Sequence, residues 1–253
     1  MKYVVVGTSH AGYAAIETLL ISDPEAEIEV FESAEAPSFL SCGIQSYLED
    51  VAPSLQSLHY ADAESLKEQG VNLHLQTTVT DLDTQNKTVT IKKDGNTSEV
   101  SYDKLFLSPG AVPNELPING INEYNNVLFM RGEEWAGKIK ERMQNAKKAI
   151  VVGGGYIGIE AAEAFTKAGI DTTLMDDHDR IINTYLDKEF TDILEKNIAE
   201  HGLKFKGNAS VKALKADDNN NVTAVVTDDG EYEADTVLFA VGVKPATEWL
   251  DGK

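Results

Sequence analysis

Two glycine-rich segments and a single cysteine are the residues of this chain best suited to chemistry. The first segment is Gly7-Thr8-Ser9-His10-Ala11-Gly12 and the second is Gly153-Gly154-Gly155-Tyr156-Ile157-Gly158, each after a short apolar run. In such a segment the first glycine permits a tight turn and the last lets a helix pack closely on a strand. The small middle residue, Ser9 in the first copy, lets a pyrophosphate approach backbone N–H groups. The pair therefore predicts two dinucleotide sites.

Each glycine segment is followed by an acidic residue at the spacing expected of a ribose ligand. Glu32 lies 20 positions after Gly12, and Asp176 lies 18 positions after Gly158. A carboxylate there accepts hydrogen bonds from ribose hydroxyls and repels a 2′-phosphate. Because no arginine adjoins Asp176-Asp177, the second site is expected to prefer NADH over NADPH. The alternative interpretation is that both are ordinary solvated carboxylates at strand ends.

Cys42 is the only cysteine of the chain, which excludes an internal disulfide framework and fits a reducing compartment. Ser41-Cys42-Gly43 is predicted to open a helix, where the positive end of the helix dipole favours the thiolate. The thiolate is the form that attacks a peroxide or a disulfide. A redox role is therefore favoured over the alternative of a buried structural thiol.

His10 lies inside the first glycine segment, an unusual place for a bulky side chain. It is a candidate to stabilise the Cys42 thiolate or to deliver a proton. The alternative is a surface imidazole beside the pyrophosphate. No metal site is predicted, because no ligand spacing relates the remaining histidines, which are His59, His74, His178 and His201.

The hydrophobic periodicity predicts an α/β fold with two Rossmann-like dinucleotide-binding domains, each a parallel sheet with helices plus a β-meander. Helices are expected at 11–21, 62–69, 135–144, 157–168 and 187–201. Strands are expected at 3–6, 28–31, 71–75, 79–82, 88–92, 99–102, 105–107, 150–152, 172–175, 222–226 and 236–241. In the last helix the residues expected to face the core are Phe190, Ile193, Leu194 and Ile198. Residues 103–110 also resemble residues 235–242, which indicates a duplication of the whole unit.

The composition excludes several classes of partner. The formal net charge of −20 repels nucleic acid and anionic lipid, and no basic stripe offsets it. No apolar run approaches the ~20 residues of a membrane span, and Met1-Lys2 leads directly into a strand rather than a signal peptide. A cytoplasmic protein with its native start, acting on small molecules, is expected.

At these motifs the chain resembles the flavin- and NADH-dependent peroxidases and oxidases of the pyridine nucleotide–disulfide reductase superfamily. The segments that carry the resemblance are 38–43, 108–113, 155–165, 185–192 and 240–245, which together span nearly the whole chain. Around Ser108-Pro109-Gly110 and Met130-Arg131-Gly132 the chain looks most like NADH peroxidase.

The resemblance implies FAD and NADH as cofactors. It implies an FAD-binding domain over residues 1–115, an NADH-binding domain over 116–242, and the start of a return to the FAD domain over 243–253. The cofactor-binding residues predicted are Gly7, Thr8, Ser9, His10, Ala11, Gly12, Glu32, Cys42, Val79, Ser108, Pro109, Gly110, Ala111, Arg131, Gly153, Gly155, Tyr156, Ile157, Gly158, Glu160, Asp176, Tyr185 and Gly242. The residues from Gly7 to Arg131 in this set are expected to bind FAD, and those from Gly153 onward are expected to bind NADH. Tyr156 is also expected to shield the flavin as a mobile aromatic side chain.

The activity implied is an FAD-dependent NADH peroxidase in which Cys42 and His10 are catalytic. NADH reduces FAD, Cys42 reduces hydrogen peroxide to water through a sulfenic acid, and the reduced flavin restores the thiolate. Position 14 is alanine, whereas peroxidases of this group often carry an acid there that orients the histidine.

Three alternatives remain open at this point. A water-forming NADH oxidase would use the same cysteine with oxygen as its substrate. A coenzyme A disulfide reductase would need a basic entry groove, for which this acidic chain offers no residues. Relatives continue past the position of Lys253 into a Gly-Asp motif and a dimerisation domain, so a truncated nucleotide-binding fragment without turnover is the third alternative. The parent protein is expected to be a homo-oligomer.

Overall fold

The computed structural model describes residues 1–253, which divide into two compact units. The first unit consists of Met1–Leu40, Gln56–Val112 and Pro245–Lys253, and the second of Ser41–Leu55 and Pro113–Lys244. Each unit contains a parallel sheet, helices and an antiparallel meander, so the predicted α/β fold class is confirmed. The chain passes from one unit to the other after residues 40, 55, 112 and 244. The last two passages lie in strands β8 (Ala111–Pro113) and β17 (Val243–Pro245), which pair with each other.

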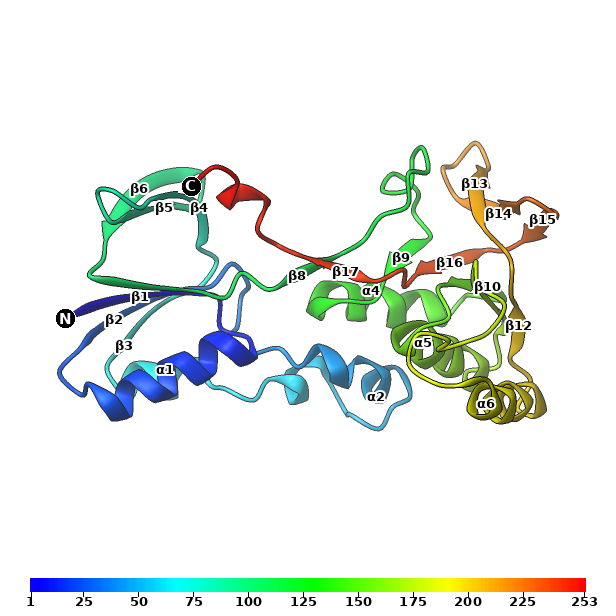
Figure 1. The fold of residues 1–253 in the computed structure, drawn as a ribbon, viewed down its shortest axis with the longest axis horizontal. Coiled ribbons are helices and arrows are strands. Elements are labelled where there is room, and N and C mark those ends of the chain that lie inside the picture. Colours follow the sequence, from blue (N-terminus) through cyan, green and yellow to red (C-terminus); the bar gives the residue numbers. More distant parts are fainter. The chain divides into compact units, whose positions relative to one another are not determined.

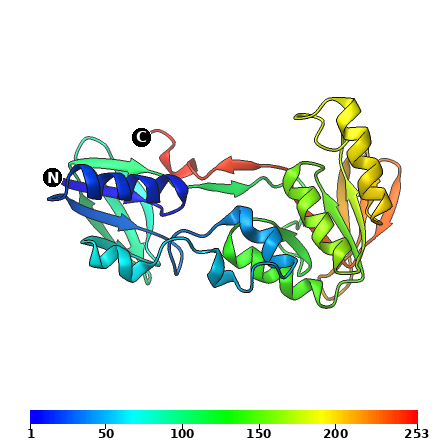
Figure 2. The same cartoon turned by 90° about the horizontal axis from the view of Figure 1, so that it is seen from below.

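The first unit is built on a four-stranded parallel sheet of order β3-β2-β1-β7. Its strands are β1 (Lys2–Val6), β2 (Glu27–Phe31), β3 (Val71–His74) and β7 (Lys104–Leu107). Side chains alternate along β1, so Val5 packs toward helix α1 (His10–Ser22) while Val4 and Val6 pack against the meander on the opposite face. The meander consists of β4 (Thr78–Asp83), β5 (Thr88–Lys93) and β6 (Asn96–Ser101), and α3 (Ala63–Glu68) completes the unit (Figures 1 and 2).

The second unit repeats this plan with a five-stranded parallel sheet of order β12-β11-β10-β16-β9. Its strands are β9 (Val127–Phe129), β10 (Lys148–Val152), β11 (Asp171–Met175), β12 (Lys204–Lys206) and β16 (Thr236–Phe239). The meander is β13 (Val211–Ala216), β14 (Val222–Thr227) and β15 (Gly230–Glu233), and the helices are α4 (Gly132–Met143), α5 (Tyr156–Lys167) and α6 (Lys188–Glu200). Strand β1 lies between β2, which follows α1, and β7, which follows the first meander, and β10 lies likewise between β11 and β16. The two glycine segments therefore occupy equivalent positions.

Residues Ser41–Leu55 cluster with the second unit, whereas the expected boundary placed them in the first. The reason is the packing of the short helix α2 (Ile44–Leu48) on α4 and α5. The Gln45 side-chain amide donates to Glu163 over 3.0 Å, and the Lys140 ammonium donates to the Leu48 carbonyl over 2.8 Å. These bonds tie the cysteine-bearing segment to the helices of the second unit.

The prediction for the core face of α6 is wrong for two of its four residues. Phe190 and Ile193 are 55% and 68% exposed, and the buried residue of this helix is Thr191. The helix packs on the three-residue strand β12, which is too short to cover a full apolar stripe. Strands β8, β9, β12, β13, β15 and β17 were not expected. None of the helices has the length and apolar character needed to cross a bilayer.

Candidate dinucleotide sites and the cysteine

The first glycine segment is the turn between β1 and α1, as its spacing predicts. Gly7 has a φ of +86°, and a Cβ at this position would lie 2.3 Å from the Ser108 carbonyl oxygen. A Cβ on Gly12 would lie 1.9 Å from the Gly7 carbonyl oxygen, so only glycine fits either position. The helix begins after Ser9, whose side chain makes no capping hydrogen bond. Its first backbone N–H groups are therefore left for an anionic ligand.

Glu32 closes the base of this first turn. Its carboxylate accepts hydrogen bonds from the Thr8 backbone N–H at 2.9 Å and the Thr8 hydroxyl at 2.6 Å. The Ser108 hydroxyl donates to the Val6 carbonyl over 2.6 Å, which fixes the turn from the other side. Thus Glu32 is held against the turn as a ribose ligand would be, and Ser108 acts on the turn itself.

The second glycine segment forms the same turn between β10 and α5. Gly153 has a φ of +111°, and a Cβ on Gly158 would lie 1.8 Å from the Gly153 carbonyl oxygen. In contrast, a Cβ on Gly155 would meet no atom within 4 Å. Gly155 is the N-cap residue of α5, and as a glycine it has no side chain to occupy the first backbone N–H groups of the helix. The middle position of the turn is therefore open, which is the condition for a pyrophosphate to reach the backbone.

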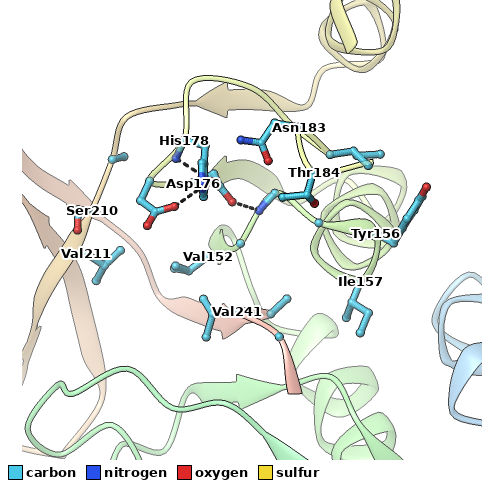
Figure 3. A pocket seen from close by; sticks show the side chains of 18 of the residues that line it. Val152, Tyr156, Ile157, Asp176, His178, Asn183, Thr184, Ser210, Val211 and Val241 are labelled. Atoms are coloured by element: carbon cyan, nitrogen blue, oxygen red, sulfur yellow. Dashed lines mark hydrogen bonds and ion pairs between the residues drawn. The ribbon is translucent and has the colours of Figure 1, made fainter. Parts of the chain in front are cut away.

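A pocket of about 680 Å³ opens over this second turn (Figure 3). Its walls come from the carboxyl ends of the strands, from the start of α5 and from the loop that joins β11 to α6. In an open parallel sheet this edge is where ligands bind. The lining residues that the sequence predicted are Gly153, Gly155, Tyr156, Ile157, Asp176, Tyr185 and Gly242.

Asp176 sits at one side of this pocket with both carboxylate oxygens engaged. One oxygen accepts a short hydrogen bond from the Gly154 N–H, and the other accepts from the His178 backbone N–H at 2.8 Å. The His178 ring nitrogen Nδ1 lies 2.9 Å from the same oxygen, and it lies 2.7 Å from a carboxylate oxygen of Asp177. Hydrogen bonding to Asp176, followed by the negative charge of Asp177, raises the pKa of the His178 imidazole.

Sequence reasoning missed part of this pocket. The loop residues Ile182, Asn183 and Thr184 and the segment Ala209–Val211 line it but belong to no recognisable motif. Ile182 has a φ of +48°, unusual for a β-branched residue, and its N–H donates to the Gly154 carbonyl over 2.8 Å. That bond anchors the loop to the glycine turn. Asp176, Asp177 and His178 bring three possible metal-ligand atoms close together. The contacts of the His178 ring with the two carboxylates account for this closeness. The absence of a metal site therefore stays a prediction.

Two residues predicted to bind NADH lie outside the lining. Gly158 is buried in the turn, where its role is close packing. Glu160 follows one turn into α5, and burial, with a smaller contribution from the charge of Glu163, raises the pKa of its carboxyl. Of the residues predicted around FAD, Val79 is 7% exposed within the core of the first unit, and Arg131 precedes α4 in the second unit.

Cys42 is exposed, so the alternative of a buried structural thiol is wrong. It lies in a 3-10 turn (Ser41–Gly43) rather than at the start of an α-helix, and the helix that follows has five residues. The helix-dipole argument made from the sequence therefore does not apply. What the structure supports is access: the one sulfhydryl of the chain is open to a small oxidant.

His10 is exposed at the start of α1, and its Nδ1 lies 2.7 Å from the hydroxyl of Tyr60. The Tyr60 ring is met edge-on by Tyr13, at 5.6 Å between ring centroids. Position 14 is alanine, and the hydroxyl that meets the His10 ring comes from Tyr60, 50 positions away in the chain. No sequence signal identified Tyr60.

The sequence pattern of the family described as pyridine nucleotide-disulphide oxidoreductase matches residues 1–253. The chain belongs to this family. An NADH oxidase of Enterococcus faecalis is 42% identical to it over 255 residues, which cover 100% of this chain and 57% of that protein. A CoA-dependent NAD(P)H sulfur oxidoreductase of Pyrococcus furiosus is 33% identical over 249 residues, covering 98% of this chain and 55% of that protein.

Among solved structures, a water-forming NADH oxidase of Lactobacillus brevis bound to NADH matches with a TM-score of 0.95 and 35% identity. The match covers 100% of this chain and 56% of the Lactobacillus brevis chain. The predicted placement in the NADH oxidase and peroxidase group of the superfamily is confirmed by these relatives. The chain spans little more than half the length of the relatives named here.

Proposed function

We propose that this chain carries the two nucleotide sites of an FAD-dependent NADH peroxidase, which reduces hydrogen peroxide to water through Cys42. The observation that carries the proposal is the pairing of two carboxylate-backed glycine turns with a single exposed thiol. Relatives named NADH oxidase, and one solved with NADH bound, support the oxidation of NADH.

The residues present fit both cofactors. In the first unit, the open N-terminus of α1 would hold the FAD pyrophosphate and Glu32 its ribose. In the second, the open position at Gly155 and the N-terminus of α5 would hold the NADH pyrophosphate, with Asp176 on the ribose. When bound, these cofactors would together supply two electrons per NADH oxidised. The acidic pair Asp176-Asp177 favours a nucleotide with a free 2′-hydroxyl.

Cys42 performs the chemistry that the protein itself contributes. Its thiolate attacks one oxygen of hydrogen peroxide, the O–O bond breaks, and the departing hydroxide takes a proton to become water. The sulfur is left as a sulfenic acid, since these 253 residues contain no second cysteine to form a disulfide. Two electrons and one proton then return it to the thiolate and release a second water.

His10 is proposed as the proton partner of this cycle. Its Nδ1 faces the Tyr60 hydroxyl, so Nε2 is the ring nitrogen left to exchange a proton. Tyr60 orients the imidazole in the way that an acid at position 14 would have done.

A second candidate is a water-forming NADH oxidase, in which oxygen is the final electron acceptor and Cys42 reduces the peroxide formed. The names of the Enterococcus faecalis and Lactobacillus brevis relatives favour it. A CoA-dependent activity, as named for the Pyrococcus furiosus relative, is the least favoured of the three. A net charge of −20 opposes the approach of the highly anionic coenzyme A.

The test is NADH consumption by the complete flavin-loaded protein, with anaerobic hydrogen peroxide in one arm and oxygen in the other. A peroxidase consumes NADH with peroxide and leaves it largely intact with oxygen, and Cys42→Ser abolishes the peroxide arm. Rapid consumption with oxygen would instead support the oxidase. Unchanged peroxide turnover in Cys42→Ser would remove the role assigned to the thiol.

A further inference from the structure

The imidazole of His178 is the one titratable base at the carboxylate end of the second pocket. We propose that His178 determines how this pocket discriminates between a 2′-hydroxyl and a 2′-phosphate, and that its protonation relaxes the preference for NADH over NADPH. This inference rests on the proposed function, because it assumes that a dinucleotide occupies the pocket. Its chemistry is local to Asp176, Asp177 and His178, which are consecutive lining residues of the pocket. Figure 3 shows Asp176 and His178 side by side.

The geometry fixes which ring nitrogen carries the proton. Nδ1 lies 2.9 Å from Asp176 and 2.7 Å from Asp177, and a carboxylate only accepts hydrogen bonds, so Nδ1 is a donor to both. Titration therefore occurs at Nε2. In the neutral ring Nε2 accepts a hydrogen bond, as from a ribose hydroxyl, and in the charged ring it donates one, as to a phosphate oxygen.

The charge balance of the wall changes with the same proton. With a neutral imidazole, Asp176 and Asp177 present two negative charges to a 2′-phosphate and repel it. With an imidazolium, one of these charges is offset at hydrogen-bond distance and a donor is added. The hydrogen bond to Asp176 and the charge of Asp177 raise the pKa of His178.

The charged groups of the surrounding elements are already paired. Lys206 on β12 is paired with Asp229, and Lys212 on β13 is paired with Asp228. In the loop itself, the Arg180 guanidinium lies 3.6 Å from Asp179. The His178 backbone carbonyl is fixed by the Asn208 N–H at 2.8 Å. Asp176 and Asp177 are thus the charges that act on the imidazole.

The experiment measures the dissociation constants of NADH and NADPH separately, by calorimetry on this chain, between pH 5.5 and pH 8.5. His178→Asn keeps an N–H donor near Nδ1 without a titrating charge, and His178→Arg keeps a permanent charge. His201→Gln, an exposed histidine at the end of α6, is the matched control. Because the 2′-phosphate itself protonates near pH 6, the comparison of interest is the wild type against His178→Asn.

We expect the NADPH-to-NADH ratio of dissociation constants to fall roughly threefold to tenfold more in the wild type than in His178→Asn as the pH is lowered. His178→Arg should show an NADPH-to-NADH ratio of dissociation constants below that of the wild type at every pH. His201→Gln should follow the wild type. Identical pH profiles for the wild type and His178→Asn would overturn the role of His178 while leaving NADH binding intact. Failure of both nucleotides to bind, with the chain folded, would overturn the proposed function as well.

Discussion

Replacing Asp176 by asparagine should weaken NADH binding far more than it changes the fold. The carboxylate is 15% exposed and accepts from the Gly154 N–H, the His178 N–H and the His178 ring. Asparagine has nearly the same shape but offers one accepting oxygen and no charge. Hydrogen bonds to a charged group contribute about 1.5–3 kcal/mol each.

Losing the bond to one ribose hydroxyl, with part of a second, corresponds to about 2–3 kcal/mol of NADH binding free energy. At about 1.4 kcal/mol per factor of ten, the dissociation constant should rise roughly 30- to 150-fold. The assay is titration of NADH into the folded chain, followed by calorimetry or nicotinamide fluorescence, with denaturant unfolding measured in parallel. Asp192→Asn, on the exposed side of α6, is the control because its pairing with Lys188 lies outside the pocket. An NADH affinity within threefold of wild type would refute the assignment of Asp176 to the ribose.

Three further predictions concern the second glycine turn, the orientation of His10 and the pH dependence of stability. Gly158→Ala should lower the free energy of unfolding by about 3 kcal/mol, because its Cβ would lie 1.8 Å from a carbonyl oxygen, whereas Gly155→Ala, with open space, should unfold like wild type yet bind NADH weakly; equal stability of the two variants contradicts this. Tyr60→Phe should shift the ¹⁵N resonances of the His10 ring toward a mixture of tautomers, and unchanged resonances would remove Tyr60 as its orienting partner. Hydrogen bonds from Lys206 and then Thr227 lower the pKa of Asp229 from 3.8 to about 2. Since a depressed carboxyl pKa stabilises the fold above its unfolded value, the stability difference between wild type and Asp229→Asn should be complete above pH 3.8 and vanish only as the pH falls through about 2; a difference already lost at pH 4 would contradict this.

The parts of the site that the sequence predicts are those set by spacing along a strand–turn–helix unit. Gly7 and Gly12 lie at the two ends of one turn, so their positions follow from the chain geometry. Glu32 comes directly after β2, and Asp176 comes directly after β11. Parallel pairing of these strands with β1 and β10 brings each carboxylate back to its glycine turn. These contacts needed no tertiary information beyond the βαβ unit.

The parts that could not be predicted depend on packing between distant segments. Tyr60 meets His10 because a loop with no motif returns to the start of α1. Residues Ser41–Leu55 belong to the second unit because Gln45 and Lys140 make hydrogen bonds across segments about 90–120 positions apart. Phe190 and Ile193 lie on an amphipathic helix, so periodicity alone predicted that they are buried. They are exposed because the edge strand on which the helix packs has only three residues.

In the proposed cycle, Cys42 takes one oxygen atom from hydrogen peroxide, and electrons from NADH remove that oxygen again. The most direct measurement is the intact mass of the complete flavin-loaded protein after one equivalent of peroxide, and again after anaerobic addition of NADH. We expect the protein to gain the mass of a single oxygen, mapped to Cys42, and to lose it when NADH is added. A Cys42 that gains no oxygen, or an oxygen that NADH does not remove, would contradict it.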